Sequence, residues 1–344
     1  MRPRKKTGQR RVSITDIAKR CGVSHSTVSR ALTDGPMISP ETKERVQRIA
    51  RKMGYTPNAI ARGLVTKRTS TIGLVVTTIA DPFVGEVAQG VEETALDNGY
   101  HVILCECNAQ PERELASVRM LREKCVDAVI VTASRVGSLY APMLSELGIP
   151  VLLINNQQEG HYLYSVRTDD LHGGHLVGEL LASLGHRRIA YISGPPDAYS
   201  RLERLEGCRA ALHDHGLIIP EEWVVPGDGW PSGGEAGVQA LLRCSPRPTA
   251  IYCYDDVTAI GALRGAKSAG LRVPGDLSII GFDDIAFAAF VDPPLTTVAQ
   301  AKYTLGQYAM QLVLRLLREQ QDVEDILLTP KLVVRESCAP PPRE

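Results

Sequence analysis

Residues 14–33 read ITDIAKRCGVSHSTVSRALT, and this stretch predicts two short helices joined by a tight turn. Gly22 ends the first helix, and Ser24 is placed to cap the second. Apolar residues recur at helical spacing on both sides of the turn, first at Ile14, Ile17, Ala18 and Cys21 and then at Val28, Ala31 and Leu32. The pattern is typical of a helix–turn–helix.

The second helix of this motif turns four polar residues outward: His25, Ser26, Ser29 and Arg30. A short helix with exposed polar residues near its N-terminus suits the major groove of DNA. The distribution of charge agrees with binding to DNA, because residues 1–70 hold seventeen Lys and Arg against four Asp and Glu in a chain of zero net charge. We interpret this division as a phosphate-binding module joined to an acidic body. A solvated basic tail is the alternative, which the interleaved helical pattern disfavours.

Domain boundaries follow from changes in the pattern along the chain. A third helix is expected to begin at the cap Ser39, with Pro40 in its first position, and to end at Gly54. The segment 57–65 is too short for a stable isolated helix, so we expect it to fold only against a partner. The expected parts are a disordered basic arm at 1–11, a helix–turn–helix DNA-binding domain at 12–56, a hinge helix and linker at 57–70, a ligand-binding and dimerisation domain at 71–339 and a tail at 340–344.

From Thr71 onward, strands and helices alternate, which predicts a doubly wound α/β fold with parallel sheets. The strands are too many for one sheet, so we expect two Rossmann-like lobes with a ligand cleft at the carboxyl ends of their strands. Strands are expected at 72–76, 101–105, 128–131, 151–154, 189–192, 224–225, 250–253 and 277–280. Helices are expected at 83–98, 112–124, 174–184, 201–215, 233–242 and 257–269.

Several classes of protein are disfavoured by what the sequence lacks. The N-terminal residues are charged, and no stretch reaches the ~18 apolar residues that cross a bilayer, so a cytoplasmic protein is expected. The eight cysteines include no CxxC pair and read as free thiols in a reducing compartment. Neither a Gly-x-Gly-x-x-Gly after the first strand nor a Walker loop is present, so no cofactor is expected.

Two alternative functions stay open on the residues alone. The paired carboxylates Asp255-Asp256 and Asp283-Asp284 are compatible with a glycosidase or a metal site. Binding of hydroxyl groups explains them without chemistry, and we expect neither an enzyme nor a metal. A free two-lobed solute-binding protein is the other alternative, and the helix–turn–helix argues against it.

The chain resembles the lactose-repressor/galactose-repressor (LacI/GalR) family of bacterial transcription regulators over residues 12–339. The motifs that carry the resemblance in the first domain and hinge are Thr15-Asp16-Ile17-Ala18, Gly22-Val23-Ser24, Thr27-Val28-Ser29-Arg30-Ala31-Leu32 and Gly54-Tyr55-x-Pro57-Asn58-x-x-Ala61-Arg62-x-Leu64. Those in the body are Gly185-His186-Arg187-Arg188-Ile189, Gly281-Phe282-Asp283-Asp284, Pro293-Pro294-Leu295-Thr296-Thr297-Val298 and Leu332-Val333-Val334-Arg335-Glu336-Ser337. The resemblance implies a periplasmic-binding-protein-like body and a repressor of carbohydrate or related catabolic genes.

For DNA, the resemblance implies a homodimer on a palindromic operator. Base readers would be His25, Ser26 and Arg30, since arginine can grip a guanine with two hydrogen bonds. Leu64 would wedge into the minor groove, with Ala61 allowing close approach and Arg62 reaching phosphate or base. Phosphate contacts would come from Ser13, Ser24, Ser29, Ser39, Tyr55 and Asn58. The C-terminal tail has no heptads, which favours a dimer over a tetramer.

For the small-molecule effector, the resemblance implies a sugar, sugar phosphate, nucleoside or purine in the cleft. Polar contacts would come from Asn155, Arg204, Asp255 and Asp283, and apolar walls from Phe83 and Trp230. Asn155 stands where aspartate is common in the family. Lys302 would favour an anion such as a sugar acid if it faced the cleft, and solvent exposure is its alternative. Asp256 is expected to cap the helix that starts at Val257, and Asp284 to be structural. The ligand would shift a population of two states.

Overall fold

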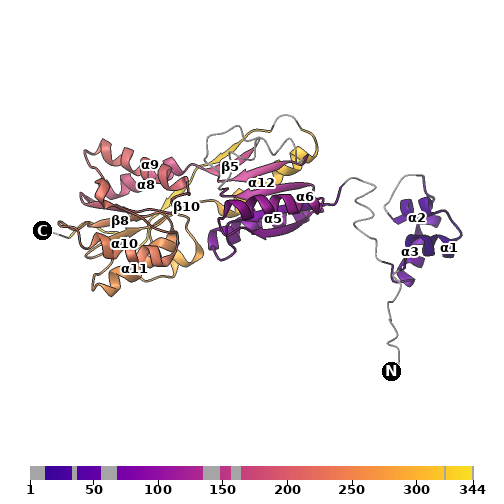
Figure 1. Cartoon of the computed structure of the whole chain (residues 1–344), viewed down its shortest axis with the longest axis horizontal. Helices are drawn as coiled ribbons and strands as arrows, with labels where there is room; N and C mark the ends of the chain where they lie inside the picture. Colours follow the sequence, from indigo (N-terminus) through magenta and orange to yellow (C-terminus); the bar gives the residue numbers. More distant parts are fainter. Residues whose placement is uncertain are drawn as a thin grey trace, which may run out of the picture. The chain divides into compact units, whose positions relative to one another are not determined.

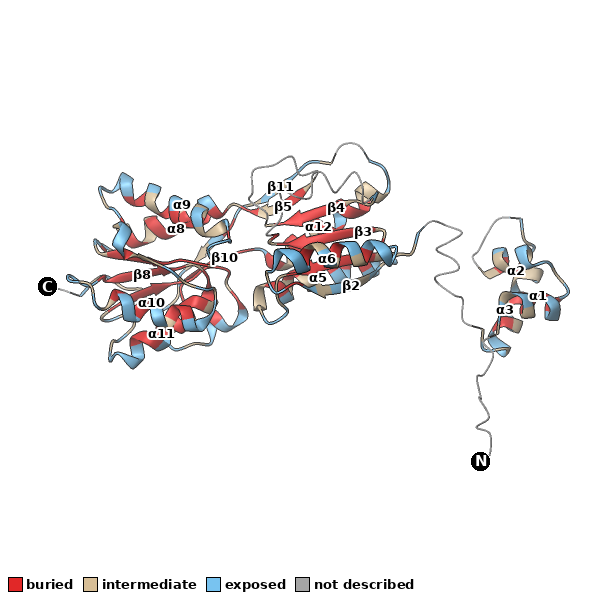
Figure 2. Cartoon of the chain, viewed as in Figure 1, coloured by how far each residue is buried: buried red, intermediate tan, exposed pale blue. Residues whose placement is uncertain are grey.

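The computed structural model describes residues 12–32, 37–55, 68–134, 148–155, 164–320 and 323–342, and the chain divides into a unit of Met1–Thr69 and a unit of Ser70–Glu344. We call the first unit the headpiece and the second the body. Figure 1 shows their elements along the sequence, and Figure 2 shows which faces of these elements are buried. In the described part of the chain, no helix has the length and apolar character needed to cross a membrane.

The headpiece contains the three helices expected from the sequence, α1 (Ile14–Cys21), α2 (His25–Leu32) and α3 (Pro40–Lys52). Ser13 caps α1 through a reciprocal capping box with Asp16, and Gly22 ends it with φ +64°. Their buried faces share one small core, formed by Ile17, Ala18, Cys21, Val28, Ala31, Val46 and Ala50. The predicted helix–turn–helix is therefore confirmed.

The first lobe of the body is a six-stranded parallel sheet with strand order β11-β5-β4-β3-β1-β2. Its elements are β1 (Thr71–Val76), α5 (Pro82–Asp97), β2 (His101–Glu106), α6 (Pro111–Glu123), β3 (Ala128–Thr132), β4 (Val151–Ile154), β5 (Ser165–Thr168), α12 (Lys302–Leu317) and β11 (Ile326–Leu328). Alternate residues of β1 face opposite sides of the sheet: Leu74 packs in the cluster with α5 and α12, and Val75 in the cluster with α6.

The second lobe has a four-stranded parallel sheet of order β7-β6-β8-β9. Its elements are α8 (Asp170–Ser183), β6 (Ile189–Ile192), α9 (Ser200–Asp214), β7 (Val224–Val225), α10 (Pro231–Leu241), β8 (Ala250–Cys253), α11 (Asp256–Ser268) and β9 (Ser278–Ile280). Helices α10 and α11 cover one face and α8 and α9 the other. The strands β10 (Thr297–Ala299) and β12 (Lys331–Val333) form a separate antiparallel pair, and two short 3-10 helices span Glu221–Trp223 and Ala286–Ala289.

The chain passes between the lobes three times: after β5, after β10 and after β11. The expected two lobes and parallel sheets are confirmed, and each strand and helix listed for the body is present with ends shifted by a few residues. The expected hinge helix after residue 57 lies outside the described residues. The sequence reading did not anticipate that α12 and β11, near the end of the chain, return to complete the first lobe. This return brings residues near Gln300 beside residues near Asn155.

Candidate functional site

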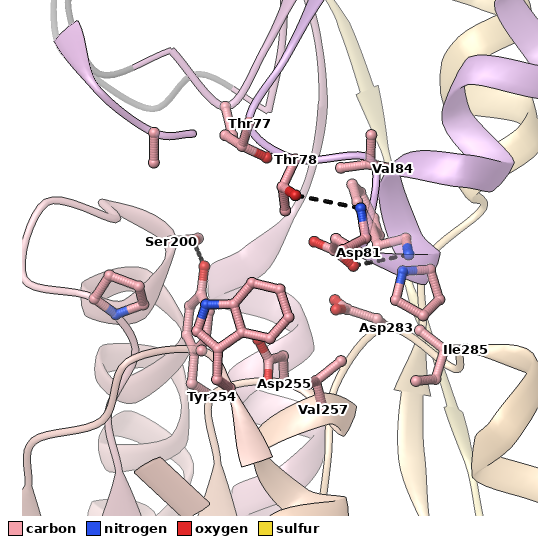
Figure 3. A pocket seen from close by; sticks show the side chains of 18 of the residues that line it. Thr77, Thr78, Asp81, Val84, Ser200, Tyr254, Asp255, Val257, Asp283 and Ile285 are labelled. Atoms are coloured by element: carbon pink, nitrogen blue, oxygen red, sulfur yellow. Dashed lines mark hydrogen bonds between the residues drawn. The ribbon is translucent and has the colours of Figure 1, made fainter. Parts of the chain in front are cut away.

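A cavity of about 490 Å³ lies in the body, lined by residues of both lobes (Figure 3). Much of the lining follows directly on the carboxyl ends of parallel strands, where open α/β sheets bind ligands. From the first lobe these residues are Thr77 and Thr78 after β1 and Asn155 after β4; from the second they are Tyr254 and Asp255 after β8. All six residues that the sequence suggested for the effector line this one cavity: Phe83, Asn155, Arg204, Trp230, Asp255 and Asp283.

Arg204 on α9 is the centre of the polar wall and is only 4% exposed. Its Nε donates to Asp170 Oδ1 at 2.7 Å, and one terminal nitrogen donates to the Tyr254 carbonyl at 2.7 Å. The other terminal nitrogen lies 3.6 Å from Asp283 Oδ1. The guanidinium carbon also sits 3.7 Å from the ring centre of Phe282. A planar, five-donor group fits this set of partners, and a lysine does not.

Asp283 joins the cavity to the first lobe through Gln300. The Gln300 amide nitrogen donates to Asp283 Oδ1 at 2.6 Å, and its oxygen accepts from Asn155 Nδ2 at 3.2 Å and Thr168 Oγ1 at 2.6 Å. Asn155 Oδ1 in turn accepts from the Thr168 backbone. Asn155 therefore holds neighbouring residues in position as well as facing the cavity.

Neither interpretation of Lys302 is correct. The side chain is 5% exposed, so it does not point to solvent, and it is not among the residues that line the cavity. Its ammonium donates to the carbonyl oxygens of Asp283 at 2.8 Å and Asp284 at 2.7 Å and lies 3.5 Å from Glu86 on α5. The Lys302 ammonium therefore stabilises the Asp283 backbone, which has φ +108°, and does not favour an anionic ligand.

The helix α11 is capped by Asp255 and not by Asp256 as expected. Asp255 Oδ1 accepts from the Thr258 backbone at 2.7 Å, while Asp256 is the first residue of the helix. Asp256 instead accepts from the Ile285 backbone at 2.8 Å and from Thr297 Oγ1 at 2.5 Å. Asp284 pairs with Arg335 at 2.6 Å, which fits its expected structural role.

Each carboxylate pair thus divides into one residue that lines the cavity, Asp255 or Asp283, and one that is bonded to other residues away from the cavity, Asp256 or Asp284. Across the described ranges, no group of three or more His, Cys, Asp and Glu side chains is arranged for a metal ion. The carboxyl groups of Asp255 and Asp283 are placed to accept hydrogen bonds from a molecule in the cavity.

Burial governs the acidity of the cavity carboxyls. It raises the pKa of Asp255 to about 6 and that of Asp256 to about 7. It also raises the pKa of Asp283 well above its ordinary value, although Arg204 opposes the rise. Asp81, which caps α5 by accepting from the Phe83 backbone at 2.9 Å, has a pKa raised by the same cause. Protons on these groups are held more tightly than in water.

The apolar part of the wall contains more aromatic surface than the sequence suggested. Phe83 and Trp230 both line the cavity, and Trp230 is 44% exposed. Tyr254, whose hydroxyl pairs with Ser200 Oγ at 2.9 Å, and Phe287 also line it and were not anticipated. Neither were Asp81, Asp228 and Gln300. Tyr254 directly follows a buried strand and Asp81 directly precedes Pro82, so the sequence pattern could have placed both residues at the cavity. No such pattern marks Gln300.

In the headpiece, α2 exposes His25, Ser26 and Arg30, while Ser29 is partly buried. Three of the suggested phosphate contacts have hydroxyls that cap helices: Ser13 for α1, Ser24 for α2 and Ser39 for α3. Tyr55 packs partly against the headpiece core. The suggested contacts Asn58, Ala61, Arg62 and Leu64 lie outside the described residues.

Two family models match the sequence. The model of bacterial regulatory proteins of the lacI family matches residues 13–58, and a periplasmic binding protein-like domain matches residues 179–338. The HTH-type transcriptional repressor PurR of Proteus mirabilis (strain HI4320) is 35% identical over 333 residues, which cover 96% of this chain and 98% of that protein. The chain belongs to the LacI family. As a LacI-family member it is a ligand-responsive DNA-binding repressor and not an enzyme.

Solved structures agree with the LacI family in both fold and coverage. The lac repressor dimer bound to operator and the anti-inducer ONPF is 27% identical, with a TM-score of 0.87 over 96% of this chain and 100% of that one. The transcriptional regulator CelR in complex with cellobiose is 30% identical, with a TM-score of 0.73 over 95% of this chain and 100% of that one. A LacI-family regulator from Enterococcus faecium with bound ribose is 31% identical, with a TM-score of 0.71 over 78% of this chain and 99% of that one.

Proposed function

We propose that this LacI-family repressor acts as a homodimer on a palindromic operator and that a polyhydroxylated small molecule in the body cavity sets its affinity for DNA. The observation that carries the proposal is the cavity itself. Residues of both lobes line it, so a ligand held there contacts both lobes at once. A ligand that fits one relative placement of the lobes better than another shifts the population toward that placement.

The lining suits hydroxyl groups. A hydroxyl donates to a carboxylate and accepts from an arginine, and the wall offers Asp255 and Asp283 beside Arg204. Trp230 and Phe83 supply apolar faces of the kind that pack against sugar rings. A volume of about 490 Å³ lies within the range of small-ligand sites, which is ~300–1,000 Å³. CelR and the Enterococcus faecium regulator were solved with cellobiose and ribose.

The headpiece would read DNA through α2. The exposed His25, Ser26 and Arg30 would reach base edges, and Ser13, Ser24, Ser29, Ser39, Tyr55 and Asn58 would contact phosphates. The segment containing Ala61, Arg62 and Leu64 would enter the minor groove, with Leu64 as the wedge.

Exposed apolar side chains in the body support the homodimer. Strand β2 is an edge strand, yet it exposes Ile103 and Leu104, with Leu96 and Ile79 exposed on nearby segments of the same lobe. In the second lobe Phe290 is 85% exposed. Apolar edges of this kind are normally covered by a partner. The lac repressor in the matched structure is a dimer.

A thermal-shift screen of the full chain tests the proposed ligand class. The panel contains sugars, polyols, sugar acids, sugar phosphates, nucleosides and nucleobases. We expect a sugar or polyol to raise the melting temperature in a dose-dependent way and to change binding to a DNA duplex selected by the protein from a random pool. Stabilisation by nucleobases alone, or a stabilising sugar with no effect on DNA binding, would contradict the proposal.

A further inference from the structure

The charges that line the cavity are strongly unbalanced. Four carboxyl groups face it, from Asp81, Asp228, Asp255 and Asp283, and among the described lining residues Arg204 is the one cation. Both carboxylate oxygens of Asp228 already accept hydrogen bonds, Oδ1 from the Trp230 and Gly233 backbones and Oδ2 from Ser232 Oγ at 3.1 Å. The imbalance therefore lies with Asp81, Asp255 and Asp283.

Against the larger effect of burial, Arg204 lowers the pKa of Asp81, Asp255 and Asp283, but one cation does not balance three carboxyl groups. Its closest ionic partner is Asp170 at 2.7 Å, a carboxylate outside the lining, and its distance to Asp283 is 3.6 Å. Lys302 approaches Asp283 from behind, through the backbone carbonyl, and its charge is shared with Glu86 at 3.5 Å. Each nearby cation already has a carboxylate of its own.

The three carboxyls come from both lobes and turn toward the same part of the cavity (Figure 3). Their proximity is felt electrostatically, because the charge of Asp81 raises the pKa of both Asp255 and Asp283, in addition to the larger effect of burial. Buried like charges are costly until a proton or another cation joins them. A positively charged group that enters the cavity would therefore lower this electrostatic cost.

We propose that the cavity selects a sugar that carries a protonated amine, in preference to the corresponding neutral or anionic sugar. This inference rests on the proposed function, because it names the ligand class of the same cavity. An ammonium group offers three hydrogen-bond donors and one positive charge, which match three carboxyls that share the charge of Arg204. The rings of Phe83 and Trp230 in the same wall add a surface that attracts cations.

Matched sugar pairs test the inference on the full-length protein. Glucosamine, galactosamine and mannosamine are compared with glucose, galactose and mannose by thermal shift and calorimetry at pH 7. N-acetylglucosamine supplies a neutral amide, and glucosamine 6-phosphate and gluconate supply anionic groups. We expect at least one amino sugar to bind about tenfold or more tightly than its hydroxyl twin, a gain of ~1.4 kcal/mol. Equal or tighter binding of the neutral twins, or no binding of any amino sugar, overturns the inference.

The variant Asp255→Asn removes one of the three carboxyl groups. Asparagine caps helices as well as aspartate does, so α11 keeps its cap and the protein folds. We expect the preference for the amino sugar over its twin to fall several-fold. The matched control is Asp169→Asn, because Asp169 caps α8 in the same way, with Oδ1 accepting from the His172 backbone at 2.9 Å, but does not line the cavity. An unchanged preference in Asp255→Asn, or an equal fall in both variants, contradicts the inference.

The two proposals fail separately. If glucose, galactose or mannose binds and changes DNA affinity while no amino sugar is preferred, the proposed function stands and the amine inference falls. If an amino sugar is preferred but leaves DNA affinity unchanged, the amine inference stands and the proposed function falls.

Discussion

At the scale of single residues, Arg204 connects the two helices and the strand end that form the second-lobe wall. It lies on α9, bonds Asp170 at the start of α8 and reaches the Tyr254 carbonyl after β8. Asp170 is 1% exposed, and its carboxylate lies 2.7 Å from this arginine. Removing one partner of a buried ion pair is strongly destabilising, because the charge that remains loses its nearest opposite charge.

Arg204→Met should therefore destabilise the body by about 3–5 kcal/mol. The physical cause is tested by the double variant Arg204→Met/Asp170→Asn, which also removes the buried charge of Asp170 and should recover a large part of the loss. Chemical unfolding followed by tryptophan fluorescence is the measurement, because both tryptophans, Trp223 and Trp230, lie in the body. A double variant that is no more stable than the single one would contradict this explanation.

Asp256 makes the stability of the body depend on pH. Burial raises its pKa from an ordinary 3.8 to about 7, so between those values the folded protein binds a proton that the unfolded chain does not. This contribution to stability is present in full below pH 3.8 and is lost as the pH rises through 7. Asp255, with a pKa of about 6, acts in the same direction.

We expect Asp256→Asn to reduce the loss of stability that the wild type shows between pH 5 and pH 8. Asparagine can still accept from the Ile285 backbone and can donate to Thr297 Oγ1, so both hydrogen-bonding positions stay filled. Denaturant unfolding at the two pH values measures the difference. The same pH dependence in variant and wild type would show that another group is responsible.

At the scale of elements, the first lobe depends on a close crossing of α5 and α12. Gly306 lies where an added Cβ would meet the Val87 carbonyl oxygen at 2.1 Å, and Gly90 faces the Tyr303 carbonyl oxygen at the same distance. The two helix backbones are thus in contact, without room for a methyl group. Overpacking of this kind costs about 1–3 kcal/mol.

Gly306→Ala should lower the stability of the body by about that amount, because the two helices must separate to admit the methyl group. Gly85→Ala on α5 is the matched control: an added Cβ there meets nothing within 4 Å, and alanine favours a helix interior by up to ~1 kcal/mol. Melting temperatures of the two variants should move in opposite directions. A stabilising Gly306→Ala would contradict the described crossing.

The elements also show which features a sequence can predict. Buried strands such as Val151–Ile154 and Ile189–Ile192 are continuous apolar runs, so their positions were predicted to the residue. The helix α12 was not predicted, because its place in the first lobe depends on pairing between segments far apart in the sequence. The resemblance to the LacI/GalR family placed Asp255, Arg204 and Asp283 in one cleft, but it could not show that the Lys302 ammonium donates to two backbone carbonyls.

At the scale of the whole body, Gln300 joins the ligand wall to the first lobe. The amide nitrogen of Gln300 donates to Asp283, and its oxygen accepts from Asn155 and Thr168. Gln300 is 5% exposed and lies where the chain passes between the lobes. A ligand that engages Asp283 therefore contacts a carboxyl group that Gln300 connects to Asn155 and Thr168 of the first lobe.

Gln300→Leu should weaken this link while leaving the cavity of similar size. We expect the sugar that stabilises the wild type to bind within about tenfold of its wild-type affinity. Its effect on DNA binding should be much smaller, because Asp283 no longer connects to Asn155. Calorimetry and DNA-binding titrations measure the two quantities separately. Equal loss of both would mean that Gln300 only supports the fold.

We expect occupancy of the body cavity to control the binding of DNA by the headpiece. The most direct test titrates a fluorescent palindromic duplex, selected from a random pool, with the full chain in the presence and absence of the sugar that stabilises it most. We predict that saturating sugar changes the affinity for this duplex at least about fivefold and leaves the affinity for a scrambled duplex unchanged, a coupling of ~1 kcal/mol or more. Equal affinity for both duplexes, or a selective affinity that the sugar leaves unaltered, would contradict the claim.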